Sequence, residues 1–264
     1  MTTTDSTVGS TIADGLATIT LRRAAASNAL DTPTKQALLD AIRAAAAEPA
    51  VRAVLLTAAG KNFCVGQDLA EHVEALRADP STAMNTVAVH YNPLIEAFSE
   101  LAVPVIVGIR GACVGAGLGL ALAGDIRVAG SGAKFGTAFT GIGLASDSGL
   151  SHALVQALGY SRAMGLMLLG DRFTAAEAQT WGLVHRVVDD EDVDVAARDL
   201  AWSIAHGPTE AYRRLKHILR AEASGLSDTL ERERVAQEAL GATRDHSAAV
   251  EAFLTKTAPI FEGR

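Results

Sequence analysis

The first half of the chain alternates between continuous apolar runs and helix-like patterns. Two apolar runs, VRAVLLTA (51–58) and VPVIVGI (103–109), are typical of strands that are buried on both faces of a sheet. Residues 11–21 have strand composition, with a glycine that suits a hairpin turn, and DIRVAG (125–130) predicts a further short strand. The Thr32-Pro33 pair predicts the N-cap and first position of a helix between these strands.

The second half of the chain has mainly helical patterns. Thr174 and Glu177 have the spacing of a capping box, and LVHRVV (183–188) predicts one more strand. Beyond Leu200 the pattern is amphipathic and helical, without strand signals. Strands alternating with helices, followed by helices alone, predict an α/β core with a helical C-terminal region. We therefore expect a disordered tail at 1–10, a core at 11–200 and a helical region at 201–264.

Composition narrows the classes of protein. The 264 residues are 49% hydrophobic and 20% charged, as in an ordinary globular protein, and a net charge of −7 without a basic patch argues against nucleic acid. The most apolar segment, 111–124, is shorter than the roughly 20 residues of a membrane span, so we expect a buried helix and no membrane partner. Two cysteines and no signal-peptide pattern suggest a reducing, cytoplasmic location.

Two glycine-containing turns follow the two buried strands. The first is FCVGQDL (63–69), and the second is GACVGAG (111–117), which leads into the apolar helix. A turn of small residues that enters a helix leaves backbone N–H groups without intrahelical partners. Two such turns at neighbouring strand ends could direct two N–H donors at one developing negative charge, as in an oxyanion hole.

Other interpretations of the glycines stay open at this level. The small residues could serve only close packing between a helix and a strand, and the residues alone do not separate packing from an oxyanion site. A dinucleotide loop is less favoured, because Leu120 stands where the third glycine of that motif is required. No spacing of His, Cys and Asp suggests a metal site, and Cys64 and Cys113 are most simply small buried side chains.

Together, FCVGQDL and GACVGAGLGLALAGDIRVA resemble the two signatures of the crotonase (enoyl-CoA hydratase/isomerase) superfamily. The likeness continues through AKFG (133–136), GIGLASDSG (141–149), the stretch 162–188 and the closing AFLTKTAPIFEGR. It covers essentially everything from about residue 11 to the C-terminus. The two signatures at this separation are more specific than any single glycine motif.

The resemblance implies a spiral of ββα units with a C-terminal helical region used in trimerisation, giving a homotrimer or a hexamer. It implies an acyl-CoA thioester substrate and no separate cofactor, since coenzyme A is part of the substrate. The backbone N–H groups of Gln67 and Ala116 match those that hold the thioester oxygen. The basic residues that match CoA-binding regions are Arg22, Arg23 and Lys256.

The chain departs from the family where hydratases carry two glutamates. The matching positions hold Gly119 and Phe139, and neither side chain can transfer a proton. The resemblance assigns both to the substrate pocket, together with Gly115 and Tyr91. A two-glutamate hydration is therefore not expected.

Asp147 in GLASDSGLS matches the single aspartate of a subgroup that includes 1,2-epoxyphenylacetyl-CoA isomerases of phenylacetate catabolism. One carboxylate can take a proton from one carbon and return it to another, as an isomerase requires. A nearly apolar pocket would raise the pKa of this carboxyl group. The alternative is structural, because Asp147 could be the N-cap of a helix that starts at Ser148.

The remaining acidic positions favour structural roles. Asp68 suits a helix start, and Asp125 suits packing or a turn at the end of the apolar helix. Glu71 and His72 are expected on an exposed helix after the first turn, away from the chemistry. The leading hypothesis is an enoyl-CoA isomerase that acts through Asp147, with two alternatives: a hydratase with other acids, and a non-catalytic acyl-CoA-binding protein.

Overall fold

The computed structural model describes residues 6–220 and 226–264. Its main sheet has six strands in the order β1-β2-β3-β4-β6-β9, in which β1 is antiparallel to β2 and the other neighbours are parallel. Together with the predicted runs, this confirms an α/β core. The strands of this sheet are β1 (Val8–Ala13), β2 (Leu16–Leu21), β3 (Ala53–Ala58), β4 (Val105–Ile109), β6 (Ile126–Gly130) and β9 (Arg186–Val188).

The predicted hairpin forms the antiparallel edge of this sheet. Asp14 and Gly15 make its two-residue turn, both with positive φ (49° and 78°), as the tight hairpin turns require. The first strand begins at Val8, so the expected tail to residue 10 is too long, and residues 1–5 lie outside the described residues.

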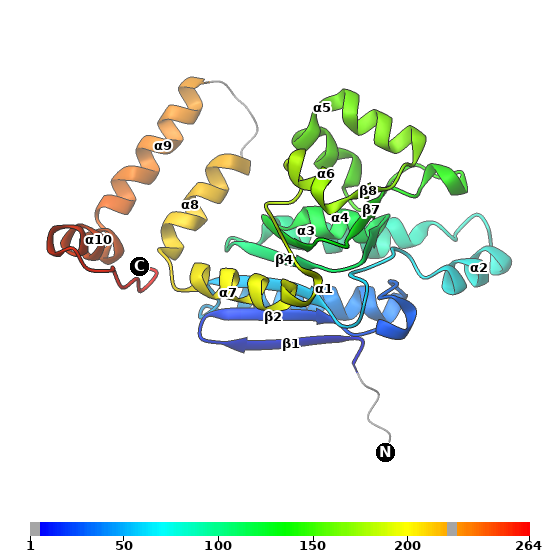
Figure 1. Ribbon diagram of the computed structural model, residues 1–264, viewed down its shortest axis with the longest axis horizontal. Helices are drawn as coiled ribbons and strands as arrows, with labels where there is room; N and C mark the ends of the chain where they lie inside the picture. Colours follow the sequence, from blue (N-terminus) through cyan, green and yellow to red (C-terminus); the bar gives the residue numbers. More distant parts are fainter. Residues whose placement is uncertain (1–5, 221–225) are drawn as a thin grey trace, which may run out of the picture.

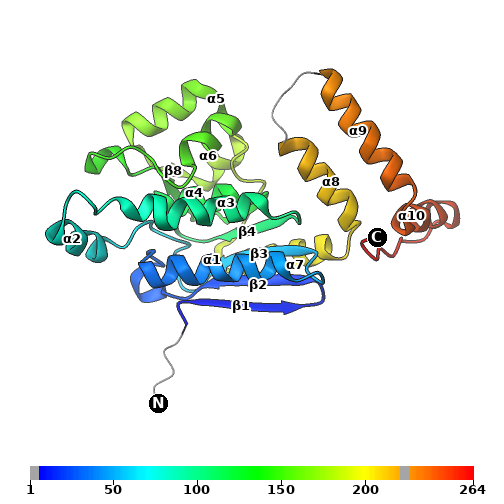
Figure 2. The ribbon, with the colours of Figure 1, turned by 180° about the vertical axis from the view of Figure 1, so that it is seen from behind.

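Helices cover both faces of the main sheet. Figures 1 and 2 show α1 (Thr32–Ala47) and α3 (Asn92–Glu100) on one face and α7 (Val193–Ala205) on the other. Successive strand residues point to opposite faces, so Leu55 packs with the alanines of α7 while Leu56 packs in the larger core cluster on the α1 side. Burial on both faces is the reason that β3 and β4 appear in the sequence as continuous apolar runs.

The start of α1 differs from the prediction by one residue. The N-cap is Asp31, whose carboxylate accepts the N–H of Thr34 at 2.9 Å, and Thr32 is the first helical residue. A carboxylate at this position also interacts favourably with the helix dipole. The capping box of Thr174 and Glu177 is present as predicted, at the start of α6 (Ala175–Thr180).

A second, three-stranded sheet in the order β5-β7-β8 was not predicted. Its short strands pair with segments far away in the sequence, which local patterns do not reveal. They are β5 (Ala112–Val114), β7 (Lys134–Gly136) and β8 (Phe173–Thr174). The buried apolar helix α4 (Ala116–Ala123) follows β5, and α5 (Leu150–Leu169) lies between β7 and β8 in the chain.

The helical stretch after the first turn is interrupted. It consists of α2 (Leu69–Ala78), a π-helical turn (Val87–Tyr91) and α3. Short 3₁₀ turns occur at Ala24–Ala26, Thr140–Ile142 and Asp190–Asp192. None of the residues of α2 is buried, so this helix is attached to the core mainly through its first turn.

The C-terminal helices lie beside the core rather than on the sheet (Figure 1). They are α8 (Thr209–Arg220), α9 (Leu226–Gly241) and α10 (Arg244–Thr255). The predicted boundary at residue 200 falls inside α7, which stays packed on the sheet to Ala205, so the helical region begins with α8. Asp125 ties α8 to the core through Lys216 (2.6 Å) and Arg220 (3.0 Å), which is the structural role expected of it. Among the described helices, none has the length and apolar content to cross a membrane.

Candidate active site

The two glycine-containing turns lie side by side, at the ends of β3 and β4. The N–H of Cys64 donates to the Ala112 carbonyl at 3.1 Å, and the N–H of Val114 donates back to the Cys64 carbonyl at 3.0 Å. A Cβ atom on Gly117 would lie 2.4 Å from the Cys64 carbonyl oxygen, so this position requires glycine. Packing and the placement of backbone donors are thus two consequences of the same small residues.

Where the turns meet, two backbone N–H groups have no acceptor among the described residues. Leu30 bridges the first turn by donating to Gly66 (2.8 Å) and accepting from Asp68 (3.2 Å), which leaves the N–H of Gln67 between them unused. Ala116 is the first residue of α4, and within the described ranges its N–H has no acceptor. A Cβ placed on Gly66 would be 3.4 Å from the Ala116 nitrogen, so the two turns are in contact here.

A pocket of about 180 Å³ opens at these donors. This volume is below the roughly 300–1,000 Å³ of drug-sized ligand sites, so the pocket suits an acyl group rather than a whole thioester conjugate. Its lining is mostly apolar, with a few polar side chains. The lining residues are Val65, Gly66, Gln67, Leu69, His72, Gly115, Ala116, Thr137, Ala138, Phe139, Ile142, Leu144 and Asp147. A larger hollow of about 430 Å³ between α8 and α9 holds neither the glycine turns nor Asp147.

Asp147 lines the same pocket as the two free donors. Its carboxylate accepts a hydrogen bond from the Ser148 hydroxyl at 2.7 Å. The next helix, α5, begins at Leu150 after an N-cap at Gly149 that makes no side-chain cap. The backbone carbonyl of Asp147, not its carboxylate, accepts the N–H of Leu150. The N-cap interpretation of Asp147 is therefore wrong.

The surroundings of Asp147 favour its protonated form more than water would. Burial raises the pKa of the Asp147 carboxyl group above the ordinary aspartate value. The hydrogen bond from Ser148 and the positive charge of Lys35 oppose this effect only in part. A carboxylate whose pKa is raised is a stronger base than an ordinary aspartate, which suits it to taking a proton from a weakly acidic carbon.

Gly119 and Phe139 were both predicted to line the substrate pocket, and the prediction is wrong for Gly119. Phe139 forms part of the pocket wall, as does Gly115, whereas Gly119 lies under the loop that carries Asp147. A Cβ atom on Gly119 would lie 2.6 Å from the Ser148 carbonyl oxygen and 2.7 Å from its Cβ. Gly119 thus belongs to the packing beneath the pocket, and a glutamate at this position is incompatible with the observed loop.

Tyr91 is buried and does not line the pocket. Its ring lies under the Lys35 ammonium group, with 5.1 Å between the nitrogen and the ring centroid. The hydroxyl group has no hydrogen-bond partner among the described residues, and burial together with the charge of Asp147 raises the pKa of Tyr91. The prediction that Tyr91 lines the substrate pocket is therefore wrong, and its ring packs in the core against Lys35.

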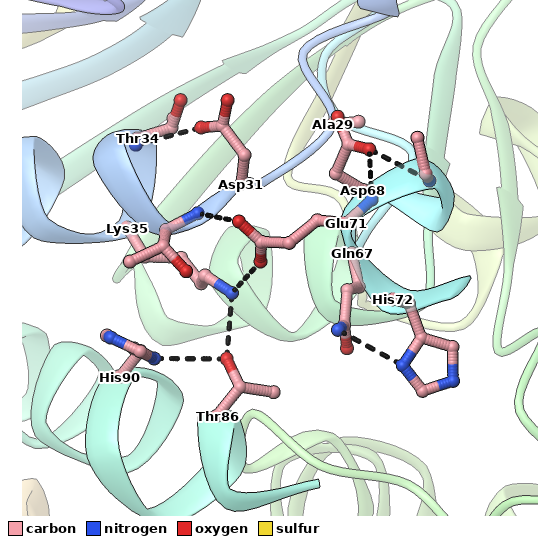
Figure 3. Close-up of polar contacts among 12 residues, drawn as sticks. Ala29, Asp31, Thr34, Lys35, Gln67, Asp68, Glu71, His72, Thr86 and His90 are labelled. Atoms are coloured by element: carbon pink, nitrogen blue, oxygen red, sulfur yellow. Dashed lines mark hydrogen bonds and ion pairs between the residues drawn. The ribbon is translucent and has the colours of Figure 1, made fainter. Parts of the chain in front are cut away.

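A partly buried ion pair holds the first turn of α2 (Figure 3). The Lys35 ammonium group, with a fully buried side chain, contacts Glu71 at 3.0 Å and the Thr86 hydroxyl at 2.7 Å. Glu71 also accepts the N–H of Thr32 at 2.6 Å, and Asp68 caps α2 as predicted. The sequence contained a signal for this network, because Lys35 stands on the apolar stripe that Leu38, Leu39 and Ile42 continue.

His72 is a pocket residue that the sequence analysis placed elsewhere. It lies on α2, half-buried, and its ring borders the pocket together with the side chain of Gln67. Gln67 Nε2 and His72 Nδ1 are 3.5 Å apart. The prediction that α2 is exposed is correct for most of the helix, but Glu71 and His72 are half-buried.

The predicted CoA-binding residues are dispersed. Arg23 is committed to the fold, since its guanidinium group contacts Asp68 at 2.9 Å and Asp31 at 3.1 Å. Arg22 is exposed and lies across Gly9 of β1. Lys256 ends α10, which Figure 1 shows far from α2 within one chain. The single chain therefore does not bring the three basic residues together. In the described ranges, no group of three or more His, Cys, Asp and Glu side chains could hold a metal ion.

A parallel-sheet core, two glycine turns with free N–H groups and a single carboxylate in an acyl-sized pocket define the class of protein. The family model for enoyl-CoA hydratase/isomerase matches residues 11–264. The chain belongs to this family, and its fold is the crotonase fold.

Individual relatives carry both activity names. The chain is 37% identical to the 1,2-epoxyphenylacetyl-CoA isomerase of Escherichia coli, over 95% of this chain and 96% of that protein. It is also 37% identical to a probable enoyl-CoA hydratase of Rhodobacter capsulatus, with 96% of each chain covered. A solved enoyl-CoA hydratase/isomerase structure from Mycobacterium abscessus has a TM-score of 0.96 and 59% identity, over 97% of this chain and 100% of that one.

Proposed function

We propose that the protein is an enoyl-CoA isomerase in which Asp147 moves a proton along the acyl group of a CoA thioester. The observation that carries this proposal is that one half-buried carboxylate shares a mostly apolar pocket with two free backbone N–H groups. The isomerase name of the Escherichia coli relative supports it, and we include 1,2-epoxyphenylacetyl-CoA in the substrate class to be tested.

The proposed reaction needs one base and one site for negative charge. The Asp147 carboxylate removes a proton from the α-carbon of a 3-enoyl thioester, and the electron pair moves onto the thioester oxygen to give a dienolate. The N–H groups of Gln67 and Ala116 hold that oxygen, and the N-terminal end of α4 adds its positive dipole. Asp147 then returns the same proton to the γ-carbon, so the double bond moves into conjugation and nothing is gained or lost.

Hydration requires more than this pocket supplies. Water addition needs a base for the water and an acid for the carbon, which are two groups acting on one face of the substrate. At the matching positions, Phe139 forms a wall and Gly119 is covered by Ser148. This arrangement favours isomerisation over hydration.

The test is the Asp147→Asn variant, which keeps the shape of the side chain and removes its proton chemistry. We expect isomerisation of 3-hexenoyl-CoA to fall by about 10²–10⁴-fold, the usual contribution of a positioned acid–base group. Binding of hexanoyl-CoA, measured by calorimetry, should persist. Turnover equal to that of the wild type would refute the role of Asp147.

Product mass separates the remaining possibilities. The wild-type enzyme is incubated with 2-enoyl-, 3-enoyl- and 1,2-epoxyphenylacetyl-CoA thioesters, and the products are analysed by mass spectrometry and ultraviolet absorbance. An unchanged mass with a changed spectrum supports isomerisation, whereas a gain of one water supports hydration. Binding without any turnover would support an acyl-CoA-binding role instead.

We also propose that the chain assembles as a homotrimer or a pair of trimers. Several apolar side chains of the C-terminal region are strongly exposed in a single chain, which is unfavourable in water: Leu219, Phe253, Leu254 and Ile260. Light scattering coupled to size-exclusion chromatography tests the proposal, and a monomer at micromolar concentration would contradict it.

A further inference from the structure

The pocket has a polar edge that the proposed proton transfer does not use. Besides Asp147, its polar side chains are Gln67, His72 and Thr137. The Thr137 hydroxyl donates to the Leu166 carbonyl at 3.1 Å, so its proton is already used inside the protein. Gln67 and His72 are therefore the side chains that can offer hydrogen bonds to an acyl group.

These two side chains satisfy each other only weakly. Gln67 Nε2 and His72 Nδ1 are 3.5 Å apart, at the outer limit for a hydrogen bond (Figure 3). Within the part of the chain that the structure describes, Gln67 Oε1 and His72 Nε2 have no hydrogen-bond partner. One amide acceptor and one imidazole nitrogen thus remain for a ligand at the border of an apolar pocket.

The polar edge is held in place rather than loosely attached. His72 directly follows Glu71, whose carboxylate is fixed by Lys35 and by the N–H of Thr32. Asp68 caps the same turn of α2 through the N–H groups of Ala70 and Glu71. A side chain on a turn anchored at two points needs little ordering when a ligand binds.

We propose that His72, paired with Gln67, is a specificity-determining residue that selects acyl groups carrying an oxygen atom over plain hydrocarbon chains. The inference rests on the proposed function in that it takes the substrate to be an acyl-CoA thioester. The apolar wall of Leu69, Phe139 and Leu144 binds carbon of either kind. A hydroxyl, carbonyl or ring oxygen would pair with the imidazole and the amide, which a hydrocarbon leaves unpaired.

Binding of saturated thioesters tests this inference separately from catalysis. The ligands are hexanoyl-CoA, 5-hydroxyhexanoyl-CoA and 6-hydroxyhexanoyl-CoA, which have no double bond to move. Calorimetry on the wild type should show at least one hydroxylated ligand binding about tenfold more tightly than hexanoyl-CoA, as expected for one hydrogen bond in a half-exposed site. In His72→Leu, the dissociation constant of hexanoyl-CoA divided by that of the preferred hydroxylated ligand should fall to about one.

Two further variants distinguish a direct contact between His72 and the ligand from a general structural effect. His72→Gln keeps a donor and an acceptor and should restore part of the preference. His152→Leu makes the same replacement at an exposed position of α5 outside the pocket and should leave the ratio unchanged. The inference is overturned if the wild type binds no hydroxylated ligand more tightly, or if the preference survives in His72→Leu. Neither outcome bears on the role of Asp147, which its own variant tests.

Discussion

The contact between Gly119 and Ser148 gives the sharpest test of how this site is built. In Gly119→Ala, the new methyl group would lie 2.6 Å from the Ser148 carbonyl oxygen and 2.7 Å from its Cβ. Ordinary contacts between such atoms begin near 3.5 Å, so the loop must move by on the order of 1 Å. Ser148 is buried with a φ of +53°, so it has little freedom to give way.

The expected cost falls on activity more than on stability. Overpacking costs about 1–3 kcal/mol, and the better helix propensity of alanine returns about 1 kcal/mol, so the net loss is about 1 kcal/mol. Asp147 is the neighbour of Ser148, and a catalytic group displaced by about 1 Å loses on the order of 10²-fold in rate. We therefore expect 3-hexenoyl-CoA isomerisation to drop about a hundredfold, while the urea unfolding midpoint falls only slightly.

Gly165→Ala is the matched control. Gly165 lies in α5, where an added Cβ would meet nothing within 4 Å. This variant should keep full activity and gain up to about 1 kcal/mol of stability. Gly119→Glu should lose isomerase activity without gaining hydration, because the loop covers the space that a glutamate needs. Wild-type activity and stability in Gly119→Ala would refute this account of the loop.

Three further predictions follow from the polar groups. Burial raises the pKa of Asp147, so in a pH–rate profile kcat/KM should fall on the acid side at a pH above the ordinary aspartate pKa. Ser148→Ala removes a hydrogen bond that lowers this pKa, so it should move the acid-side fall to higher pH. Glu71→Gln leaves the Lys35 ammonium group buried without its counter-charge and should cost about 3 kcal/mol in urea unfolding, more than Lys35→Met; equal costs would contradict this. Burial raises the pKa of Cys64 to about 12, so iodoacetamide at mildly alkaline pH should label this thiol only after denaturation, as mass spectrometry can show.

Local chemistry made several elements predictable. The caps at Asp68 and Thr174 follow from side chains that accept hydrogen bonds from nearby N–H groups. The turn at Gly15 follows because glycine adopts a positive φ without strain. The apolar runs of β3 and β4 follow from burial on both faces of one sheet. Each of these signals lies within a few residues of the structure that it predicts.

Other features depend on partners far away in the sequence. The strands β5 and β7 contain three residues each and exist because they pair with each other, which no local pattern shows. The ion pair of Lys35 and Glu71 joins positions 36 residues apart, and it decides that His72 faces the pocket rather than solvent alone. Arg23 was expected to serve a ligand and instead holds two helix starts together.

The sequence by itself determined the family, the two glycine turns and the candidate carboxylate Asp147, because these depend on residue types at fixed spacings. It left open whether that carboxylate caps a helix, and it placed Gly119 in the substrate pocket at the position of a missing glutamate. The tertiary structure decided both points, since α5 starts three residues after Asp147 and the loop before it rests directly on Gly119. Contacts between distant segments fix the direction of a side chain and the space around it, and the order of residues does not record either.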